Sequence, residues 1–585
     1  MVRRLAEAMM MRDHNHLSVR LGRWSTIVLL GFAWLLNSSP ASASPSADRP
    51  PDIVVILADD LGFSDIAPYG GEIETPNLDA LAAGGLRFRQ FYNAARCCPT
   101  RAALLTGVYP HQAGVGHMLQ PWRPPAYSSA LDERVPTFAE VLRNVGYRNL
   151  LVGKWHVGPL QGKGPTAHPL DRGFDRFHGI IGGGNHFAPK SLVRDRSTIP
   201  PGPDHYSTDD FTAAAVEFVE DHVANHEDRP FLLHLCFTAP HFPLHARPAE
   251  IARYRGRYRT GWDTLRSERF RRQVASGLFD ERARLSPRDA VAEPWDRVDD
   301  PDAWDLRMAV HAAMVDRMDQ GIGRLVETLK RIERWDNTLI IFLSDNGASA
   351  EALDSWPNPA RGHVPGSIVG TRDSHRCLEV GWANAANTPF REHKMWVHEG
   401  GISTPAIVHW PRGIAERGRW TDRVAHVIDL APTLYELVGA DHPAVRAGRP
   451  TIPLEGRSFA EEFRRNAPTT ERELAWEHEG NRAIRVGNWK LVARARGPWE
   501  LYDLSIDRTE THDLSAAAAD RVRELERRWT AWASRVGVVP WNELPGATYR
   551  PSAGYRKKSE AVEPAVEVTR PGRAEKRQAE SSSDS

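Results

Sequence analysis

Acidic and amide side chains follow two strongly apolar runs of the sequence. A continuous aliphatic run precedes Asp59 and Asp60, and the run at residues 338–344 precedes Asp345 and Asn346. Because ligands of open α/β sheets gather at the carboxyl ends of the strands, we expect these four side chains to share one sheet edge. Three carboxylates and an amide suit a hard cation, Ca²⁺ or Mg²⁺. Each pair by itself is equally typical of a turn or a helix cap.

A pair of cysteines stands where a loop is expected to meet a helix. Cys97 and Cys98 are followed by Pro99, Thr100 and Arg101. A cysteine at such a junction, with a cation nearby, can act as a thiolate nucleophile of low pKa. An ordinary buried cysteine is the alternative. The chain has only four cysteines, too few for a disulfide framework, and their spacing fits no zinc site.

The cysteine segment, with Thr106-Gly107 after it, resembles the signature of the sulfatase family, in which the first cysteine is oxidised to formylglycine. Other segments match the family's motifs in the same order along the chain. They are Asp59-Asp60, Gly153-Lys154-Trp155-His156, Ala239-Pro240-His241 with Pro243, Asp345-Asn346-Gly347, Asn387-Thr388-Pro389-Phe390-Arg391 with Lys394, and Glu399-Gly400-Gly401-Ile402. The likeness extends from about residue 51 to residue 536.

This resemblance implies a fold, a modified residue and a metal. The fold is a large α/β domain similar to alkaline phosphatase, with a small C-terminal sheet domain. A formylglycine-generating enzyme would convert Cys97 during maturation, and the metal would be Ca²⁺, with Mg²⁺ as the alternative. The implied metal ligands are Asp59, Asp60, Asp345, Asn346 and the modified Cys97.

The implied reaction is hydrolysis of a sulfate monoester by a hydrated aldehyde at position 97. One hydroxyl attacks sulfur and expels the alcohol; the second then loses its proton, and the aldehyde re-forms as sulfate leaves. Arg101 would steady the diol, and Lys154, His241 and Lys394 would hold the sulfate oxygens. His156 would be the base on the second hydroxyl, and His241 or Lys394 would protonate the leaving oxygen. The alternative for each residue is structural, as an ion-pair partner or a buried histidine.

One residue departs from the family pattern. Cys98 stands where serine, threonine or alanine is more usual, and we expect the change to be tolerated because that position carries no chemistry. A vicinal disulfide between Cys97 and Cys98 would compete with maturation in an oxidising compartment.

The elements that must position these residues indicate an α/β class. The apolar runs predict strands that are buried on both faces and that alternate with amphipathic helices. Strands are expected at residues 53–57, 231–237, 338–344 and 406–410, and helices at 77–85 and 308–334. This pattern predicts an α/β layered domain, and the family resemblance implies that it is a large mixed sheet with helices on both faces, as in alkaline phosphatase.

The domain organisation follows from changes in composition. A catalytic domain is expected over residues 52–438, with an Arg-rich helical insertion at 247–294. We expect the basic stretch of this insertion to be a solvated helix face, with contact to an anionic substrate as the alternative. A small α+β subdomain is expected over 439–545. Its antiparallel strands are predicted at residues 483–486, 489–493 and 501–504, followed by a helix at 516–533.

The N-terminus has the pattern of an export signal. Arginines precede an apolar run at residues 27–36, and a small-residue Ala-Ser-Ala follows. The run is short for a bilayer, so we predict a signal peptide over residues 1–43 and a linker over 44–51, with an uncleaved anchor as the alternative. Cleavage would give an exported protein, periplasmic or secreted, with no membrane partner. Residues 555–585 are charged and Ser-rich, which predicts a disordered tail.

Composition narrows the class of partner. Lys plus Arg and Asp plus Glu both number 75, so the net charge is zero and gives no reason to expect nucleic acid as a partner.

The expected substrate is an aryl sulfate or a sulfated carbohydrate. The alternatives are a phosphonate monoester hydrolase or phosphodiesterase of the same superfamily, and a non-catalytic protein that binds sulfated glycans. His117, His186 and His398 are weaker candidates for the pocket.

Overall fold

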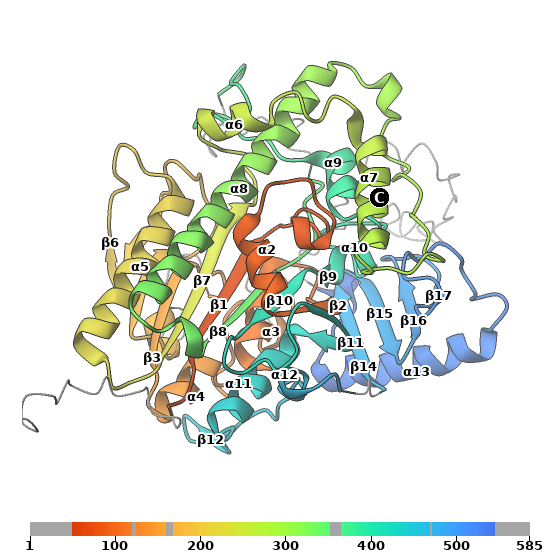
Figure 1. Ribbon diagram of the computed structural model, residues 1–585. Helices are drawn as coiled ribbons and strands as arrows, with labels where there is room; N and C mark the ends of the chain where they lie inside the picture. The colour runs from red at the N-terminus through yellow and green to blue at the C-terminus, as the bar shows by residue number, and fades with distance from the viewer. Residues whose placement is uncertain (1–48, 120–124, 159–167, 352–363, 468–470, 545–585) are drawn as a thin grey trace, which may run out of the picture. The chain divides into compact units, whose positions relative to one another are not determined.

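A mixed sheet of eleven strands runs through the part of the chain that this computed structural model describes, residues 49–119, 125–158, 168–351, 364–467 and 471–544 (Figure 1). The strand order is β11-β2-β10-β8-β1-β7-β3-β4-β5-β6, and β9 pairs with β2. The predicted α/β class is confirmed. The expected signal peptide and the expected tail lie outside the described residues, and the boundary near residue 438 stays a prediction.

The strands of this sheet have the following bounds. They are β1 (Asp52–Asp59), β2 (Leu86–Tyr92), β3 (Arg148–Lys154), β4 (Arg176–Ile180), β5 (Leu192–Arg194), β6 (Ser197–Thr198), β7 (Phe231–Pro240), β8 (Thr338–Ser344), β9 (Ser403–Thr404), β10 (Ala406–His409) and β11 (Arg419–His426). The contiguous strands β8, β1, β7, β3 and β4 are mutually parallel, so their carboxyl ends meet at one edge.

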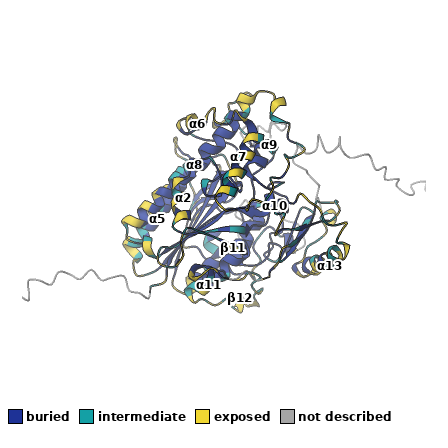
Figure 2. Ribbon diagram, turned by 45° about the vertical axis from the view of Figure 1, so that its right-hand side comes forward, coloured by how far each residue is buried: buried dark blue, intermediate teal, exposed yellow. Residues whose placement is uncertain are grey.

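Strand β1 divides the interior into two apolar cores. All of its residues are buried, and successive side chains point to opposite faces of the sheet. Ile53, Val55 and Leu57 belong to one core, whereas Val54 and Ile56 belong to the other. The apolar run of β1 is therefore packed on both faces. Figure 2 shows buried strands in the interior of the molecule.

Helices cover both faces, as expected. One core includes α3 (Cys97–Thr106), α4 (Phe138–Asn144) and α11 (Leu430–Val438). The other includes α2 (Pro76–Ala83), α5 (Ser207–His226) and α8 (Pro301–Arg331). Shorter helices are α9 (Glu379–Ala386), α10 (Glu399–Ile402) and α12 (Glu461–Arg464). Among the described residues, no helix is long and apolar enough to cross a membrane.

The Arg-rich segment at residues 247–294 contains α6 (Pro248–Tyr254) and α7 (Gly261–Ala275). The expected solvated face is only partly observed. Arg269 is fully buried, and it forms ion pairs with Asp65 (2.9 Å) and Glu72 (2.8 Å), which both belong to the segment that follows β1. Arg266 is also buried and donates to the carbonyl oxygen of Ser286 (2.8 Å).

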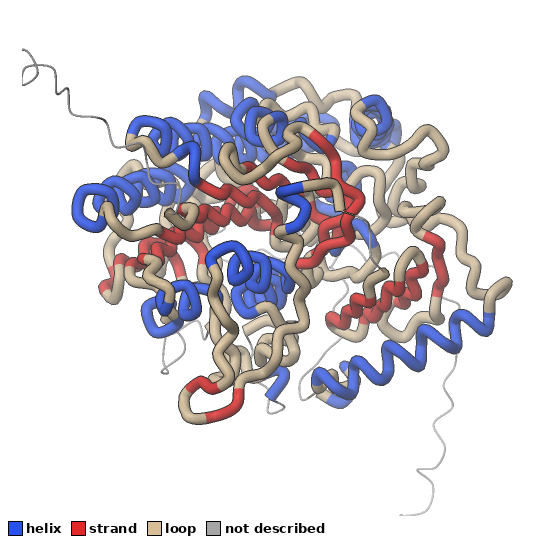
Figure 3. Tube along the Cα trace, turned by 60° about the horizontal axis from the view of Figure 1, so that its bottom comes forward, coloured by secondary structure: helices blue, strands red, loops and turns tan. Residues whose placement is uncertain are grey.

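The C-terminal part forms a second, antiparallel sheet with one long helix (Figure 3). Its strands are β14 (Glu473–His478), β15 (Asn481–Val486), β16 (Trp489–Ala493) and β17 (Glu500–Asp503), and the helix is α13 (Ala519–Val536). Strands β12 (Val445–Arg446) and β13 (Arg449–Pro450) form a separate short ribbon. The predicted small sheet with a helix is therefore confirmed.

A buried ionic cluster ties this small sheet to the large one. Lys490 of β16 pairs with Glu399, the first residue of α10, at 2.9 Å and with Glu510 at 2.7 Å, and all three side chains are fully buried. Tyr92 at the end of β2 donates to Glu399 (3.0 Å). Burial alone would raise the pKa of Glu399, but Lys490 and Arg508 lower it to about 2.

Replacing Lys490 by methionine should destabilise the protein strongly. The change leaves two carboxylates buried without their shared ammonium, and breaking a buried pair typically costs about 3–5 kcal/mol. The measurement is the urea midpoint of unfolding. The control is Arg528→Met, which removes an exposed pair with Glu473 and should cost less than about 1 kcal/mol. Equal midpoints for the two variants would contradict the role of the cluster.

Candidate active site

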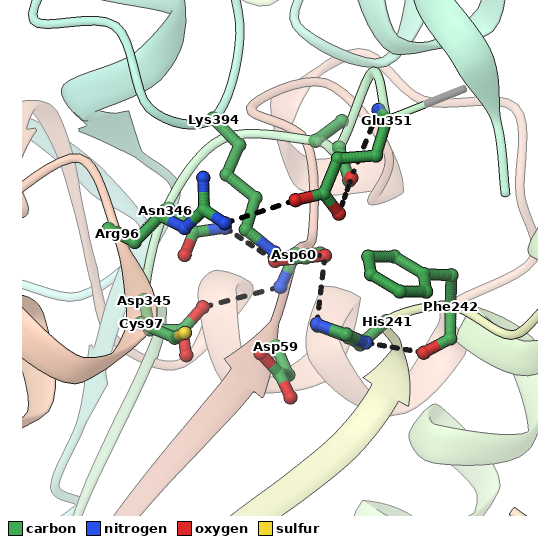
Figure 4. A network of polar contacts seen from close by, with 12 residues as sticks. Asp59, Asp60, Arg96, Cys97, His241, Phe242, Asp345, Asn346, Glu351 and Lys394 are labelled. Atoms are coloured by element: carbon green, nitrogen blue, oxygen red, sulfur yellow. Dashed lines mark hydrogen bonds and ion pairs between the residues drawn. The ribbon is translucent and has the colours of Figure 1, made fainter. Parts of the chain in front are cut away.

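The two acidic pairs meet at the carboxyl edge of the sheet, as predicted (Figure 4). Asp59 ends β1 and Asp60 follows it, whereas Asp345 and Asn346 follow the neighbouring strand β8. Asn346 donates from Nδ2 to Asp60 Oδ1 (2.7 Å), and the Asp60 backbone N–H donates to Asp345 Oδ1 (3.3 Å). The positive φ of Asp60, 65°, turns the chain sharply at this point.

Helix α3 aims its N-terminus at this edge. Cys97 is its first residue, Gly107 ends it in the left-handed conformation, and every residue between is buried. Arg101 donates from Nε to Asp345 Oδ2 (2.9 Å) and from Nη1 to the carbonyl oxygen of Lys154 (2.7 Å), and its Nη2 lies 2.8 Å from Asp345 Oδ2 as an ion pair. The helix dipole and Arg101 together favour negative charge at position 97.

Two buried ammonium groups compensate the first acidic pair. Lys154, the last residue of β3, lies 2.7 Å from Asp59 Oδ2. Lys394, on the loop between α9 and α10, lies 2.7 Å from Asp60 Oδ1. Two backbone hydrogen bonds hold this loop in place. The Lys394 N–H donates to the carbonyl oxygen of Ala348 (3.1 Å), and the Met395 N–H donates to the carbonyl oxygen of Ala95 (2.8 Å).

The two predicted histidines take different places around the cluster. His241 follows β7, and its Nε2 lies 3.5 Å from Asp60 Oδ2. His156 follows β3 with a positive φ of 57°, and its ring is within 4.8 Å of the Cys97 and Cys98 sulfurs. The structure therefore brings the predicted site residues together from four strand ends, α3 and one loop.

The surrounding cations compensate the charge of Asp59 but not that of Asp345. Burial by itself would raise the pKa of Asp59, but Lys154, His241 and Arg101 hold it below its usual range. Burial, and then the charge of Asp59, raises the pKa of Asp345 well above its usual range, although Arg101 acts against this. An additional cation would allow both carboxylates to ionise.

The environment of position 97 stabilises an anion there. A hydrogen bond from Cys98, together with Lys154 and His156, holds the pKa of Cys97 well below its usual range against the effect of burial. Burial, with the charge of Cys97, raises the pKa of Cys98. Burial and then Lys154 lower the pKa of His156, which keeps its imidazole neutral and able to accept a proton.

Two buried oxygens of the cluster fit a metal ion. Asp59 Oδ1 and Asn346 Oδ1 have no hydrogen-bond partner among the described residues. Asp59 and Asp60 each offer an oxygen in one compact group with His241. An all-oxygen set of carboxylates and an amide is the donor chemistry of Ca²⁺, and of Mg²⁺ where the geometry is octahedral.

Sequence reasoning missed two charged residues of this site. Arg96 lies 3.1 Å from Glu351 Oε1, and Figure 4 shows this pair beside Lys394 and Asp60. Burial would raise the pKa of Glu351, but Lys394, Arg96 and His241 lower it. Arg96 directly precedes the cysteine motif, which was the available signal. Glu351 is the last described residue before the gap at 352–363.

The three weaker histidine candidates lie in different places. His186 donates from Nε2 to the carbonyl oxygen of His241 (2.9 Å) and so supports the site from behind. His398 is fully buried, 3.6 Å from Glu500 of the small sheet, and belongs to the contact between the sheets. His117 lies next to Met118, whose sulfur is 3.9 Å from that of Cys97.

The chain is similar to known proteins over most of its length. The sequence model of the family described as Sulfatase matches residues 51–440, and the one described as N-sulphoglucosamine sulphohydrolase, C-terminal, matches residues 391–531. An uncharacterized sulfatase of Schizosaccharomyces pombe is 35% identical over 529 residues, 84% of this chain and 95% of the relative. An arylsulfatase of Klebsiella aerogenes is 35% identical over 443 residues, 70% of this chain and 91% of the relative.

A solved structure agrees with these sequence relationships. The crystal structure of Ps i-CgsB in complex with k-i-k-neocarrahexaose superposes with a TM-score of 0.62 at 25% identity. The superposition covers 87% of this chain and 98% of that chain.

Replacing Arg101 by methionine should destabilise the protein in the presence of a chelator. The methionine leaves Asp345 buried without its guanidinium partner, at a typical cost of about 3–5 kcal/mol. Arg101→Lys keeps the charge and should cost less, and Arg143→Met, at an exposed pair with Asp175, should cost under about 1 kcal/mol. Urea midpoints measure all three, and an Arg101→Met midpoint equal to that of Arg143→Met would argue against the cluster.

Proposed function

We propose that this chain, which belongs to the sulfatase family and hydrolyses sulfate esters, does so with a formylglycine made from Cys97 and a Ca²⁺ ion at the carboxyl edge of the sheet. The observation that carries the proposal is the set of contacts made by Arg101. Its guanidinium joins the helix that begins at Cys97 to Asp345 after β8 and to the backbone of Lys154 at the end of β3.

The proposed metal ligands are the oxygens of Asp59, Asp60, Asp345 and Asn346, with the modified residue at position 97. The unpartnered oxygens of Asp59 and Asn346 and the raised pKa of Asp345 support a cation here. A bound Ca²⁺ would supply Lewis-acid polarisation and charge compensation. Mg²⁺ is the alternative occupant.

The reaction needs a nucleophile, an acid and a base. One hydroxyl of the hydrated aldehyde at position 97 would lose its proton to solvent as its oxygen attacks sulfur, and the bond from sulfur to the alcohol oxygen breaks. That oxygen takes a proton from His241 Nε2 or Lys394 Nζ. The remaining hydroxyl gives its proton to His156, the bond from carbon 97 to the sulfate oxygen breaks, and the aldehyde re-forms.

The remaining cations would hold the substrate. Lys154 Nζ forms an ion pair with Asp59, and Lys394 Nζ forms one with Asp60. When a metal binds these carboxylates, the two ammonium groups would be free to turn toward the sulfate oxygens. Arg101 Nη2 would remain on Asp345 and steady the diol. Preorganised charges of this kind stabilise a transition state without reorganisation.

Aryl sulfates are the proposed assay substrates, supported by the 35% identity to the Klebsiella aerogenes arylsulfatase. Sulfated carbohydrates remain the second class, since the solved relative was crystallised with a carbohydrate. Export of the chain, to the periplasm or medium, and maturation by a formylglycine-generating enzyme complete the proposal. Export rests on the apolar run at residues 27–36.

The peptide that contains Cys97 should carry formylglycine when the protein is made beside a maturation enzyme. Mass spectrometry of that peptide gives the test, because the aldehyde form is lighter than the thiol form. Cys97→Ala should lose hydrolysis of 4-nitrophenyl sulfate at least about a thousandfold. Cys98→Ser is the matched control and should keep both the modification and the activity. Full activity in Cys97→Ala would exclude position 97 as the nucleophile.

Removal of metal should abolish turnover, and Ca²⁺ should restore it. Ca²⁺ should also raise the thermal midpoint of the chelated protein, because ligand that binds only the folded state stabilises it. Asp345→Ala should lose activity and the Ca²⁺-induced shift, whereas Asp422→Ala, on an exposed carboxylate, should keep both. Unchanged activity after thorough chelation would remove the metal from the mechanism.

A further inference from the structure

A second group of potential metal ligands lies apart from the aspartate cluster. We call it the His117 cluster: His117, His478 and Glu479. His117 Nε2 is 2.8 Å from Glu479 Oε1, and His478 Nε2 is 3.7 Å from the same oxygen. One ligand atom from each residue lies within 4.8 Å of the others. Both histidines are buried, and the Glu479 side chain is 14% exposed.

The cluster joins two segments that are far apart in the sequence. His117 belongs to the loop after α3, next to Met118, which contacts the sulfur of Cys97. His478 is the last residue of β14, and Glu479 begins the two-residue turn to β15. The cluster therefore lies between the nucleophile-bearing part and the small sheet.

The turn itself is unusual for its sequence. Glu479 and Gly480 have φ values of 51° and 82°, so both adopt the left-handed conformation. Two-residue hairpin turns of this kind favour Asn or Asp at the first position, because a longer side chain gains no local hydrogen bond there. Glutamate at this position instead gives a carboxylate long enough to reach His117.

The unpartnered ring of His478 points to a ligand. The residue is only 1% exposed, yet neither Nδ1 nor Nε2 has a hydrogen-bond partner among the described residues. A buried polar group without a partner is destabilising, so a bound species that uses one nitrogen would offset this cost. A metal ion needs such a free nitrogen lone pair.

The two imidazoles lie at a separation that one ion can bridge. Their ring centres are 5.4 Å apart and their planes differ by 19° in a stacked arrangement. Two imidazoles bound to one tetrahedral ion through bonds of about 2.0–2.1 Å would have ring centres roughly 5 Å apart. The observed separation is close to this value, and binding would require the two rings to rotate until both planes contain the ion.

We propose that His117, His478 and Glu479 form a second metal site that binds a divalent transition metal, with Zn²⁺ as the best match. Two imidazole nitrogens and one carboxylate oxygen are borderline donors that suit Zn²⁺ rather than Ca²⁺. Three protein ligands leave a fourth tetrahedral position for water or another oxygen ligand. The site does not depend on the proposed formylglycine or on the proposed Ca²⁺ site.

The test uses the Ca²⁺-saturated full chain, freed of transition metals, and titrates it with Zn²⁺ by calorimetry. One high-affinity Zn²⁺ should bind, and His478→Gln and Glu479→Gln should each weaken binding at least about 100-fold. Glu479→Gln preserves the shape of a partly exposed turn, so its folding can be confirmed by an unchanged thermal midpoint. The matched control is His111→Gln, which breaks a similar buried pair with Glu477 (2.9 Å) and should keep Zn²⁺ binding.

A second measurement separates this site from the thiols. Cys97, Cys98 and His156 form another potential ligand group, so Co²⁺ bound there would show thiolate charge-transfer absorption. We expect imidazole and carboxylate ligation without that absorption, and retained binding in Cys98→Ser. Absence of Zn²⁺ binding, unchanged affinity in His478→Gln and Glu479→Gln, or a thiolate band that disappears in Cys98→Ser would each overturn the proposal.

Discussion

Three buried carboxylates facing three buried cations, at one edge of the sheet, are the interaction on which the rest of the structure depends. The pairs are Asp59 with Lys154, Asp60 with Lys394, and Asp345 with Arg101. A buried charge without a partner is expensive, so each element that carries one member has to be held against the element that carries the other. The parallel strands, helix α3 and the loop before α10 are thereby fixed to one another, and the oxygens of Asp59 and Asn346 that have no hydrogen-bond partner among the described residues suit the proposed cation.

The small sheet takes part in this arrangement through the loop that carries Lys394. Glu399 begins α10 five residues further along, and it is held by Lys490 from β16 and by Tyr92 from β2. Arg391, on the same loop, reaches Glu500 of β17 (3.1 Å). The C-terminal sheet therefore holds the loop that carries Lys394 in place. This explains physically why the two sheets pack through buried ion pairs as well as apolar contacts.

The sequence was most informative for segments whose residue types fit only one kind of secondary structure and burial. Strands β1, β7 and β8 are apolar on both faces, so their buried, parallel arrangement and the polar residues at their ends could be predicted. Strand β2 could not, because its alternating Arg and aromatic residues also fit a loop or helix. Arg269 looked like part of a solvated face, since only the fold brings Asp65 and Glu72 to it. The Arg96–Glu351 pair escaped notice for the same reason, since 255 positions of sequence separate its members.

Burial of the nucleophile-bearing helix constrains the order of events during biosynthesis. Cys97 is 1% exposed, and every residue of α3 is buried beneath the sheet edge and its loops. A maturation enzyme of the proposed kind would have to bind the segment around the cysteine in an open form, which the packed helix does not offer. The proposed oxidation of Cys97 would therefore precede the packing of α3. Slow folding would lengthen the interval for this modification, and a chain that folds first would remain unmodified.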